Sequence, residues 1–458
     1  MEGTCSPPAP KPLIYGFRLN PSDISYITYI EDAIGKTPAG FVQGEFDYGS
    51  WANAFFMPRP CMVGFDGEVK YYLKPNDFTK KLDGTPSNNN DLSYPGNVMI
   101  EFPKIWYKFV SRPKQGYGEF YCSNVKVDDS YHCWCNINAE NEETDHFYLG
   151  AYHGCTYDNR MRSIAGLNLK HYSTIEYTSI YNYSVGDIVN YQDRTYKCIE
   201  NQEAGEFDPD KWEQFAYNDA CSPRHEIQAI MNSYNTLKNE WYISVWADRM
   251  LLSALLILMG KSVDTGSVFG RGVIPRYSGI QETYVTGYMD KAGMFAGNTS
   301  DTDHPVKVFG IENFWGMIQQ WTAGFTGPSS ANGGYLYKLT WGTADGSTAT
   351  SYNDDGTGYL EANVSASMPM RGYLQNMTFG PWGMVPSSVV ENLEDSRWHE
   401  YINITRLEGY LMTNVAYVDS NRTGGGALAM AALTDWTNAS IGWSFFLSYK
   451  PINSLTNE

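Results

Sequence analysis

The cysteines are candidates for catalysis or metal binding, but their spacing favours neither. All eight lie between Cys5 and Cys221. The pair in HCWC, residues 132–135, could contribute to a metal site, but no second pair follows at the spacing of a zinc site. A disulfide framework is rare in a chain of 458 residues. We therefore expect buried free thiols and no metal.

The histidines and carboxylates also fail to form a recognisable catalytic pattern. The seven histidines show no HExxH or His-x-His spacing, and neither GxSxG nor GxxxxGK[ST] occurs. Asp354–Asp355 and Glu391/Glu394 could serve as the carboxylate pair of a glycoside hydrolase, and DTDH (301–304) could bind calcium. SYNDDGTGY around Asp354 is more simply a turn, and DTDH a surface loop. We expect no catalytic residue, no cofactor and no enzymatic activity.

Composition limits the class of protein and its partners. Aromatic residues make up 15% of the chain and DEKR residues 18%, which excludes a disordered or coiled-coil protein and is typical of loop-rich β proteins and recognition surfaces. The net charge of −18 argues against nucleic acid and anionic membranes as partners. The N-terminus lacks the pattern of a secretion signal, and the longest apolar run, 250–260, is too short to span a bilayer.

Hydrophobic periodicity predicts the elements that must position any site. Alternation in VGFDGEVKYYLKPNDF and VMIEFPKIWYKFV predicts strands within 61–125. A helix is expected at 222–237, with Ser222 as N-cap. A second is expected at 246–260, which is apolar nearly all round and ends at Gly260, as a central core helix should. From 262 onward we expect strands and loops.

VFGIENFWGMIQQWTAGF, residues 308–325, fits neither a helix nor an alternating strand. Its aromatics and glycines predict an irregular core segment in which Trp315 and Trp321 are buried beneath loops.

Residues 181–216 form a candidate separate unit with strands at Asp187–Tyr191 and Arg194–Ile199 and a turn at 192–193. Its pattern of Tyr183, Gly186–Asp187, Val189, Tyr191, Tyr196, Pro209 and Trp212–Glu213 resembles the small chitin-binding-type carbohydrate module. The resemblance implies glycan binding by Tyr183, Tyr191 and Trp212. The alternative is that these rings only make the unit's own core.

Several motifs over most of the chain resemble one family. GIENFWGMIQQW and the closing RTGGGALAMAALTDWTNASIGWSFFLSYKP are similar to signatures of the formylglycine-generating-enzyme type of C-type lectin fold. IYGFRLNPSD, MPRPCMV and GNVMIEFPKIWYK resemble phage tail and tail-tip proteins of gut bacteria. The implied fold is α+β and C-type lectin-like, β- and loop-rich with two core helices, a β-rich N-terminal part and a small all-β insert. The enzymes of this family need cysteines near the C-terminus, and none follows Cys221 here, which excludes their activity.

The resemblance implies a phage virion adhesin that binds a host-surface receptor, either a glycan or a protein. Residues 1–95 would attach it to other tail or baseplate proteins, 96–180 and 217–458 would form the lectin-like body, and 181–216 the insert. Because adhesins gain affinity by avidity, we expect a homo-oligomer, most simply a trimer. The alternatives are a structural baseplate component without receptor contact and a capsule-degrading enzyme.

The receptor face is expected in the C-terminal segment 401–443, which is rich in residue types that make adaptable contacts. Trp436 and Trp443 are equally well placed to belong to the core, and retroelement diversification of this segment stays open. The candidate contact residues are Tyr410, Asn414, Tyr417, Asp419, Asn421, Trp436, Asn438 and Trp443.

Overall fold

A computed structural model describes most of the chain. The described residues are 11–20, 23–157, 160–167, 175–192, 194–214, 240–273, 285–300, 304–331, 334–341, 356, 358–364, 370–404, 412–415, 426–432 and 443–452.

Two sheets are built mainly from the first third of the chain. The four-stranded sheet has the order β2 (Asp23–Glu31), β1 (Ile14–Asn20), β10 (Tyr117–Ser123), β9 (Trp106–Arg112). The seven-stranded sheet has the order β18 (Trp241–Ile243), β30 (Leu447–Tyr449), β11 (His146–Gly150), β8 (Gly96–Pro103), β5 (Arg59–Gly64), β6 (Val69–Lys74), β7 (Asp77–Lys81). Strands from both sides of residue 95 therefore share both sheets.

The C-terminal half forms a nine-stranded sheet. Its order is β23 (Leu360–Val364), β22 (Gly334–Leu339), β21 (Gln319–Ala331), β27 (Met412–Val415), β28 (Met430–Ala432), β26 (Tyr401–Ile404), β24 (Met370–Gly380), β25 (Gly383–Val390), and β29 (Trp443–Ser444) pairs with β21.

Short elements complete the described chain. The two-stranded pairs are β3 (Gly40–Val42) with β4 (Glu45–Asp47), β12 (Cys155–Tyr157) with β13 (Arg160–Arg162), and β19 (Lys307–Val308) with β20 (Ile311–Glu312). The 3-10 turns are η1 (Gly49–Trp51), η2 (Trp134–Asn136), η3 (Pro209–Lys211) and η4 (Leu393–Asp395).

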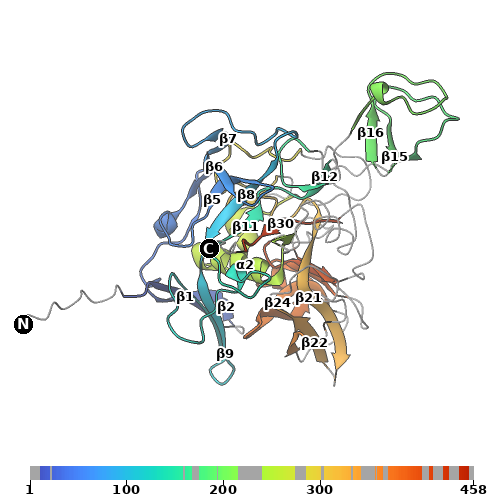
Figure 1. Ribbon diagram of the computed structural model, residues 1–458. Coiled ribbons are helices and arrows are strands. Elements are labelled where there is room, and N and C mark those ends of the chain that lie inside the picture. Colours follow the sequence, from blue (N-terminus) through green and yellow to red (C-terminus); the bar gives the residue numbers. More distant parts are fainter. Residues whose placement is uncertain are drawn as a thin grey trace, which may run out of the picture.

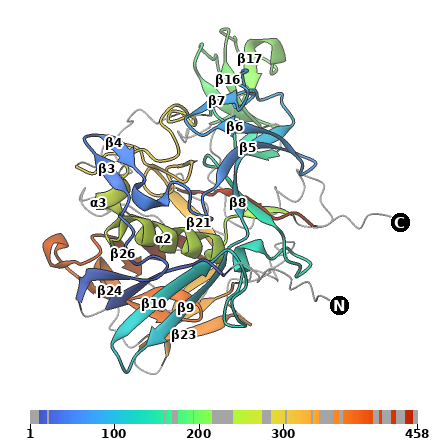
Figure 2. The same cartoon turned by 90° about the vertical axis from the view of Figure 1, so that its left-hand side faces the viewer.

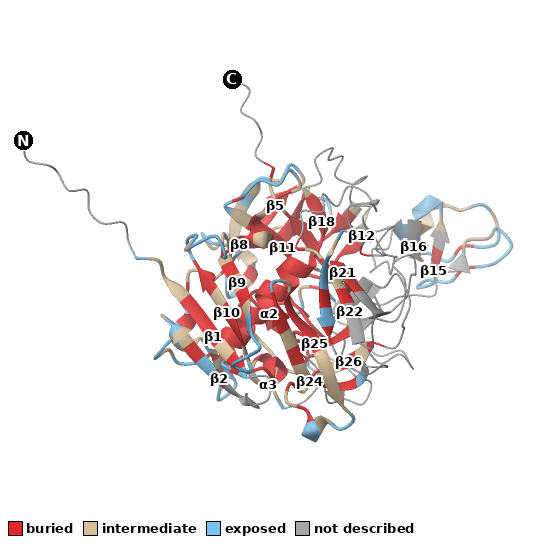
Figure 3. Cartoon of the chain, turned by 90° about the horizontal axis from the view of Figure 1, so that it is seen from below, coloured by how far each residue is buried: buried red, intermediate tan, exposed pale blue. Residues whose placement is uncertain are grey.

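The helix α2 (Trp246–Gly260) lies at the centre, and all its residues are buried (Figure 3). Each of the three large sheets contacts it. Tyr29 of β2 donates a hydrogen bond to a carbonyl oxygen of its last turn, Phe325 of β21 stacks on its first residue, and Ser448 of β30 donates to the carboxylate in its first turn. Figure 2 shows α2 between β5–β8 and β9–β10. The expected core helix at 246–260 is thus confirmed, because a helix covered on every side must be apolar on every side.

The expected α+β, C-type lectin-like fold is wrong. The described chain is mostly β, and its α-helices are α2 and the single-turn α3 (Thr265–Phe269). Residues 222–237, where the other core helix was expected, lie outside the described residues. The prediction failed because aromatic and glycine motifs report tight turns and core anchors, which many β architectures need, and they do not specify strand order. No described helix is long and apolar enough to cross a membrane.

Residues 308–325 lack periodicity because the backbone turns repeatedly. Phe309, Asn313 and Met317 have φ values of 52°, 54° and 63°, in the left-handed region that L-residues seldom adopt. Trp315 and Trp321 are fully buried, as predicted. Trp315 Nε1 donates to a backbone carbonyl 3.0 Å away, which fixes the indole beneath the segment.

The unit at 175–214 has its own small core. Its sheet has the order β14 (Ile175–Glu176), β15 (Ile188–Tyr191), β16 (Arg194–Cys198), β17 (Trp212–Gln214), close to the two strands predicted. Its buried aromatics form a cluster separate from the main core. Figure 1 shows β15 and β16 set apart from the other labelled strands.

Candidate functional site

The HCWC motif forms part of an aromatic site. Cys133 and Cys135 point into the core, whereas His132 is exposed and Trp134 is half-buried. Burial raises the pKa of Cys133 to about 12 and that of Cys135 well above its ordinary value, so both thiols stay protonated at neutral pH. The six described cysteines are buried and free, as expected. The described residues contain no cluster of three or more metal-ligating side chains.

Backbone hydrogen bonds hold this motif against β9, which is the edge strand of its sheet. Tyr107 and His132 exchange two bonds, of 2.8 and 3.0 Å. Asn136, at the end of η2, is buried and accepts a hydrogen bond from the Ile105 amide. Anchored on both sides, Trp134 is directed out of the core.

A cavity of about 470 Å³ opens beside β9 at this point. We call it the aromatic pocket, and its walls include Lys108, Phe109, Ser130, His132, Trp134 and Trp341. Its volume falls within the roughly 300–1,000 Å³ typical of small-molecule sites.

Near-parallel rings form one wall of the aromatic pocket. The rings of His132 and Trp134 stack at 4.6 Å, those of Trp134 and Trp341 are parallel to within 3° at 6.4 Å, and those of Trp341 and Phe109 lie 6.2 Å apart. Trp341 Nε1 donates to the backbone carbonyl of Pro381, so its orientation is fixed as well. Phe109 and Trp341 are buried and hold the other two rings in place, so the accessible apolar surface of this wall comes from half-buried Trp134 and exposed His132.

Polar groups lie at the rim of this wall. Lys108 Nζ donates to the Ser130 hydroxyl at 2.9 Å and lies 3.7 Å from the Asp128 carboxylate. Burial, and then the charge of Lys126, lower the pKa of His132, which is therefore neutral at pH 7 and can both donate and accept a hydrogen bond. An apolar surface made by half-buried Trp134 and exposed His132, edged by fixed donors and acceptors, suits a ligand with one apolar face and polar groups around its perimeter, such as a sugar ring.

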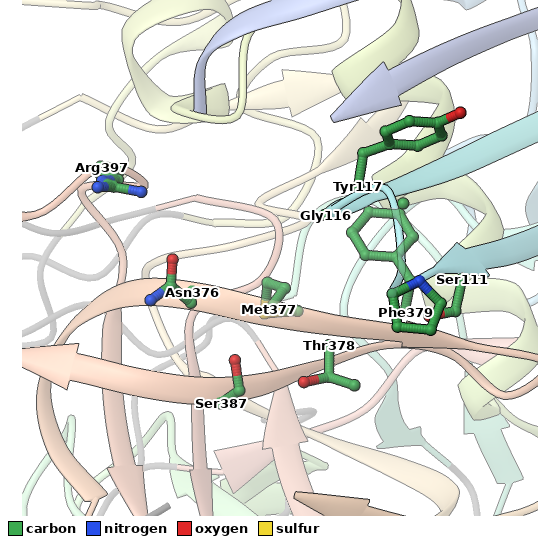
Figure 4. A pocket seen from close by; sticks show the side chains of 11 residues that line it. Ser111, Gly116, Tyr117, Asn376, Met377, Thr378, Phe379, Ser387 and Arg397 are labelled. Carbon is green, nitrogen blue, oxygen red and sulfur yellow. The ribbon is translucent and has the colours of Figure 1, made fainter. Parts of the chain in front are cut away.

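A second cavity, of about 530 Å³, lies further along β9. We call it the polar pocket. Figure 4 shows Tyr117 and Phe379 at one end of it and Arg397 at the other, with polar residues of β24 and β25 between them. Its walls include Ser111, Tyr117, Asn376, Thr378, Phe379, Ser387 and Arg397.

The ends of the polar pocket are held by buried neighbours. Ser396 and Trp398 are buried, and both hydrogen-bond the carbonyl of Leu374, so Arg397 between them is directed outward. At the other end the Phe379 ring packs on Gly118, where any Cβ would lie 2.2 Å from the ring.

Other ionisable groups are buried in the protein interior. Burial raises the pKa of Glu400 to about 8 and that of Asp290 to about 6. Neither residue lines the aromatic or the polar pocket. Glu391 and Glu394, the carboxylate pair suggested by the sequence, are exposed and line a third, open hollow beside Arg371 and Tyr401.

Most of the expected receptor face lies outside the described residues. Asn414 belongs to β27, where it is paired between Trp321 and Ala431, and Trp443 begins β29, paired with Gln319. Tyr410, Tyr417, Asp419, Asn421, Trp436 and Asn438 lie outside the described residues.

The aromatic residues of the insert form its core. Tyr183 and Trp212 are 7% and 4% exposed, and Trp212 Nε1 donates to Gln202 Oε1 at 2.6 Å. Tyr191 is half-buried and stacks on Phe207 at 4.1 Å. Tyr183 and Trp212 therefore belong to the insert's own core, as in the alternative that the sequence left open. A unit of this size has few other apolar residues with which to build a core.

Sequence reasoning missed the aromatic pocket. Trp134 was visible only as part of a cysteine motif, and Trp341 and Phe109 lie far from it along the chain. The alternation of small buried and larger, more exposed residues in HCWC was the signal in the sequence that could have indicated this pocket. No family model and no curated protein matches this sequence.

Proposed function

We propose that this protein is a phage virion adhesin and that it binds a host-surface glycan in the aromatic pocket. Glycan binding is supported by half-buried Trp134 and exposed His132, whose rings are held by the buried Trp341 and Phe109 in a cavity edged by polar side chains. The virion part rests on the resemblance of several motifs to phage tail proteins. Partners would be other tail or baseplate proteins and further copies of this chain, most simply in a trimer.

Binding without catalysis is favoured by the chemistry of the pocket. Glycoside hydrolysis needs two carboxyl groups across the scissile bond. The described residues that line the aromatic pocket include no Asp or Glu. The pocket offers stacking area and hydrogen bonds, which are the means of recognition.

The test is a single substitution, Trp134→Ala, in the full-length chain. Losing the Trp134 ring should weaken glycan binding by roughly 1.5–3 kcal/mol, or about 10–100-fold in Kd. Binding is measured on a microarray of bacterial-surface polysaccharides and then by calorimetry with the best ligand. Trp106→Ala is the matched control, because Trp106 is half-buried on the same strand and does not line the pocket.

Three results would contradict the proposal. One is a wild-type protein that binds no surface glycan. Another is equal affinity of the Trp134 variant and wild type. The third is release of free sugar on incubation, which would favour the capsule-degrading alternative. Immunogold labelling of phage particles tests the virion assignment separately, and label on the tail is expected.

A further inference from the structure

The aromatic and polar pockets share two walls. Residues 107–110 and Arg112 of β9 line the first, and Ser111 and Pro113 line the second. Residues 376–379 of β24 line the polar pocket, and Pro381, in the turn between β24 and β25, lines the aromatic pocket. The pockets therefore follow one another along the same strand and the same hairpin, as successive subsites of one elongated ligand would.

The charged residues that line the two pockets are basic. The chain has 51 acidic and 33 basic residues, yet the described residues lining the two pockets include Lys108, Arg112 and Arg397 and no carboxylate. Lys108 lies beside Asp128, and Arg112 Nε lies 3.3 Å from the buried Glu119 carboxylate. The cation in the polar pocket is Arg397.

Arg397 suits a planar anion. A guanidinium has five N–H donors in a fork that fits a carboxylate with two parallel hydrogen bonds. Because Ser396 and Trp398 are buried and hold the backbone on β24, little backbone freedom remains to be lost on binding. The side chains of Asn376, Thr378 and Ser387 provide amide and hydroxyl groups for the neighbouring oxygens of a sugar.

We propose that the two pockets form one elongated site for a glycan that carries a carboxylate. An uncharged sugar stacks on Trp134, and the carboxylated sugar lies in the polar pocket with its carboxylate on Arg397. This inference rests on the proposed glycan-binding function and adds the class of ligand.

The test compares acids with their own methyl esters, which keep the shape of the sugar and remove its charge. Oligogalacturonides and sialyllactose, each printed beside its methyl ester, are probed with the full-length chain. Wild type should bind at least one acid about ten-fold or more tightly than its ester. Arg397→Gln should abolish that difference by weakening binding of the acid to about the level of the ester. Arg371→Gln removes the same charge from the exposed face of β24 outside both pockets and should change nothing.

The outcomes separate the two proposals. If Trp134→Ala weakens binding but acids and esters bind equally, or if Arg397→Gln keeps the preference, the carboxylate site is refuted while glycan binding stands. Tighter binding of sulfated lactose than of sialyllactose would also refute a carboxylate site. Failure of wild type to bind any glycan would refute both.

Discussion

Glu400→Gln should remove a pH-dependent loss of stability. Glu400 is fully buried, accepts a hydrogen bond from the Thr265 hydroxyl at 3.0 Å and another from the Leu428 amide at 2.6 Å. Burial, together with the nearby Asp264 carboxylate, raises its pKa from 4.5 to about 8. The folded protein therefore keeps this carboxyl group protonated at neutral pH, whereas the unfolded chain ionises it.

The sign of the effect is set by this difference. Below pH 4.5 the group is protonated in both states, and its contribution to stability is fully present. As the pH rises from 4.5 to about 8, only the unfolded state gains by losing the proton, so the free energy of unfolding falls. At about 1.4 kcal/mol for each pH unit, the loss reaches at most roughly 5 kcal/mol, and it levels off above pH 8.

Glutamine keeps the hydrogen bonds without the titration. Its carbonyl oxygen can accept from the Leu428 amide and its NH₂ can donate to the Thr265 hydroxyl oxygen. At pH 5 the variant should match wild type to within about 1 kcal/mol, and by pH 8 it should be more stable by up to roughly 4 kcal/mol. The assay is urea unfolding of both proteins across this range. The other buried acids are present in both proteins, so their contributions cancel in the difference between the two free energies of unfolding. A difference that stays constant with pH would refute the reasoning.

Two further predictions concern buried tryptophans. Trp315→Ala should destabilise the protein by roughly 3–5 kcal/mol in urea unfolding, and a near-wild-type midpoint would contradict a core role. Trp212→Ala in the full chain should abolish hydrogen-exchange protection in 175–214 while the amides of α2 stay protected, because the two regions have separate cores. Loss of protection in both regions would show that the insert and the main core unfold together.

The elements that the sequence predicted correctly are those in which local pattern and tertiary position agree. The helix at 246–260 is apolar all round and is covered on every side, so its bounds match. The strands β15 and β16 were also predicted, since alternation and a two-residue turn specify a hairpin locally. Sheet order was not predictable, because β30 from the C-terminus joins β11 and β18, and nothing local selects such a partner.

The candidate site escaped prediction for the same reason. Trp134 and Trp341 meet only because η2 is anchored to β9 and the end of β22 reaches the same place. In the sequence, a tryptophan in a core and a tryptophan in a binding wall look alike, as Tyr183 and Trp212 in the insert demonstrate. The exposed fraction of the side chain distinguishes a core tryptophan from a binding-site tryptophan, and that fraction depends on long-range packing.

The position of the pockets favours rigid recognition. Their walls come from β9, β24 and β25 and from turns fixed by buried neighbours, and β9 and β24 belong to sheets that pack on the central helix. A wall fixed before binding loses little entropy when the ligand arrives, so a modest number of contacts can give useful affinity. Half-buried Trp134 packs against the main core and is not one of its buried members. Its removal should therefore weaken binding far more than folding, whereas removal of Trp315 should do the reverse. A variant of Trp134 that unfolds as readily as the Trp315 variant would assign this wall to the core.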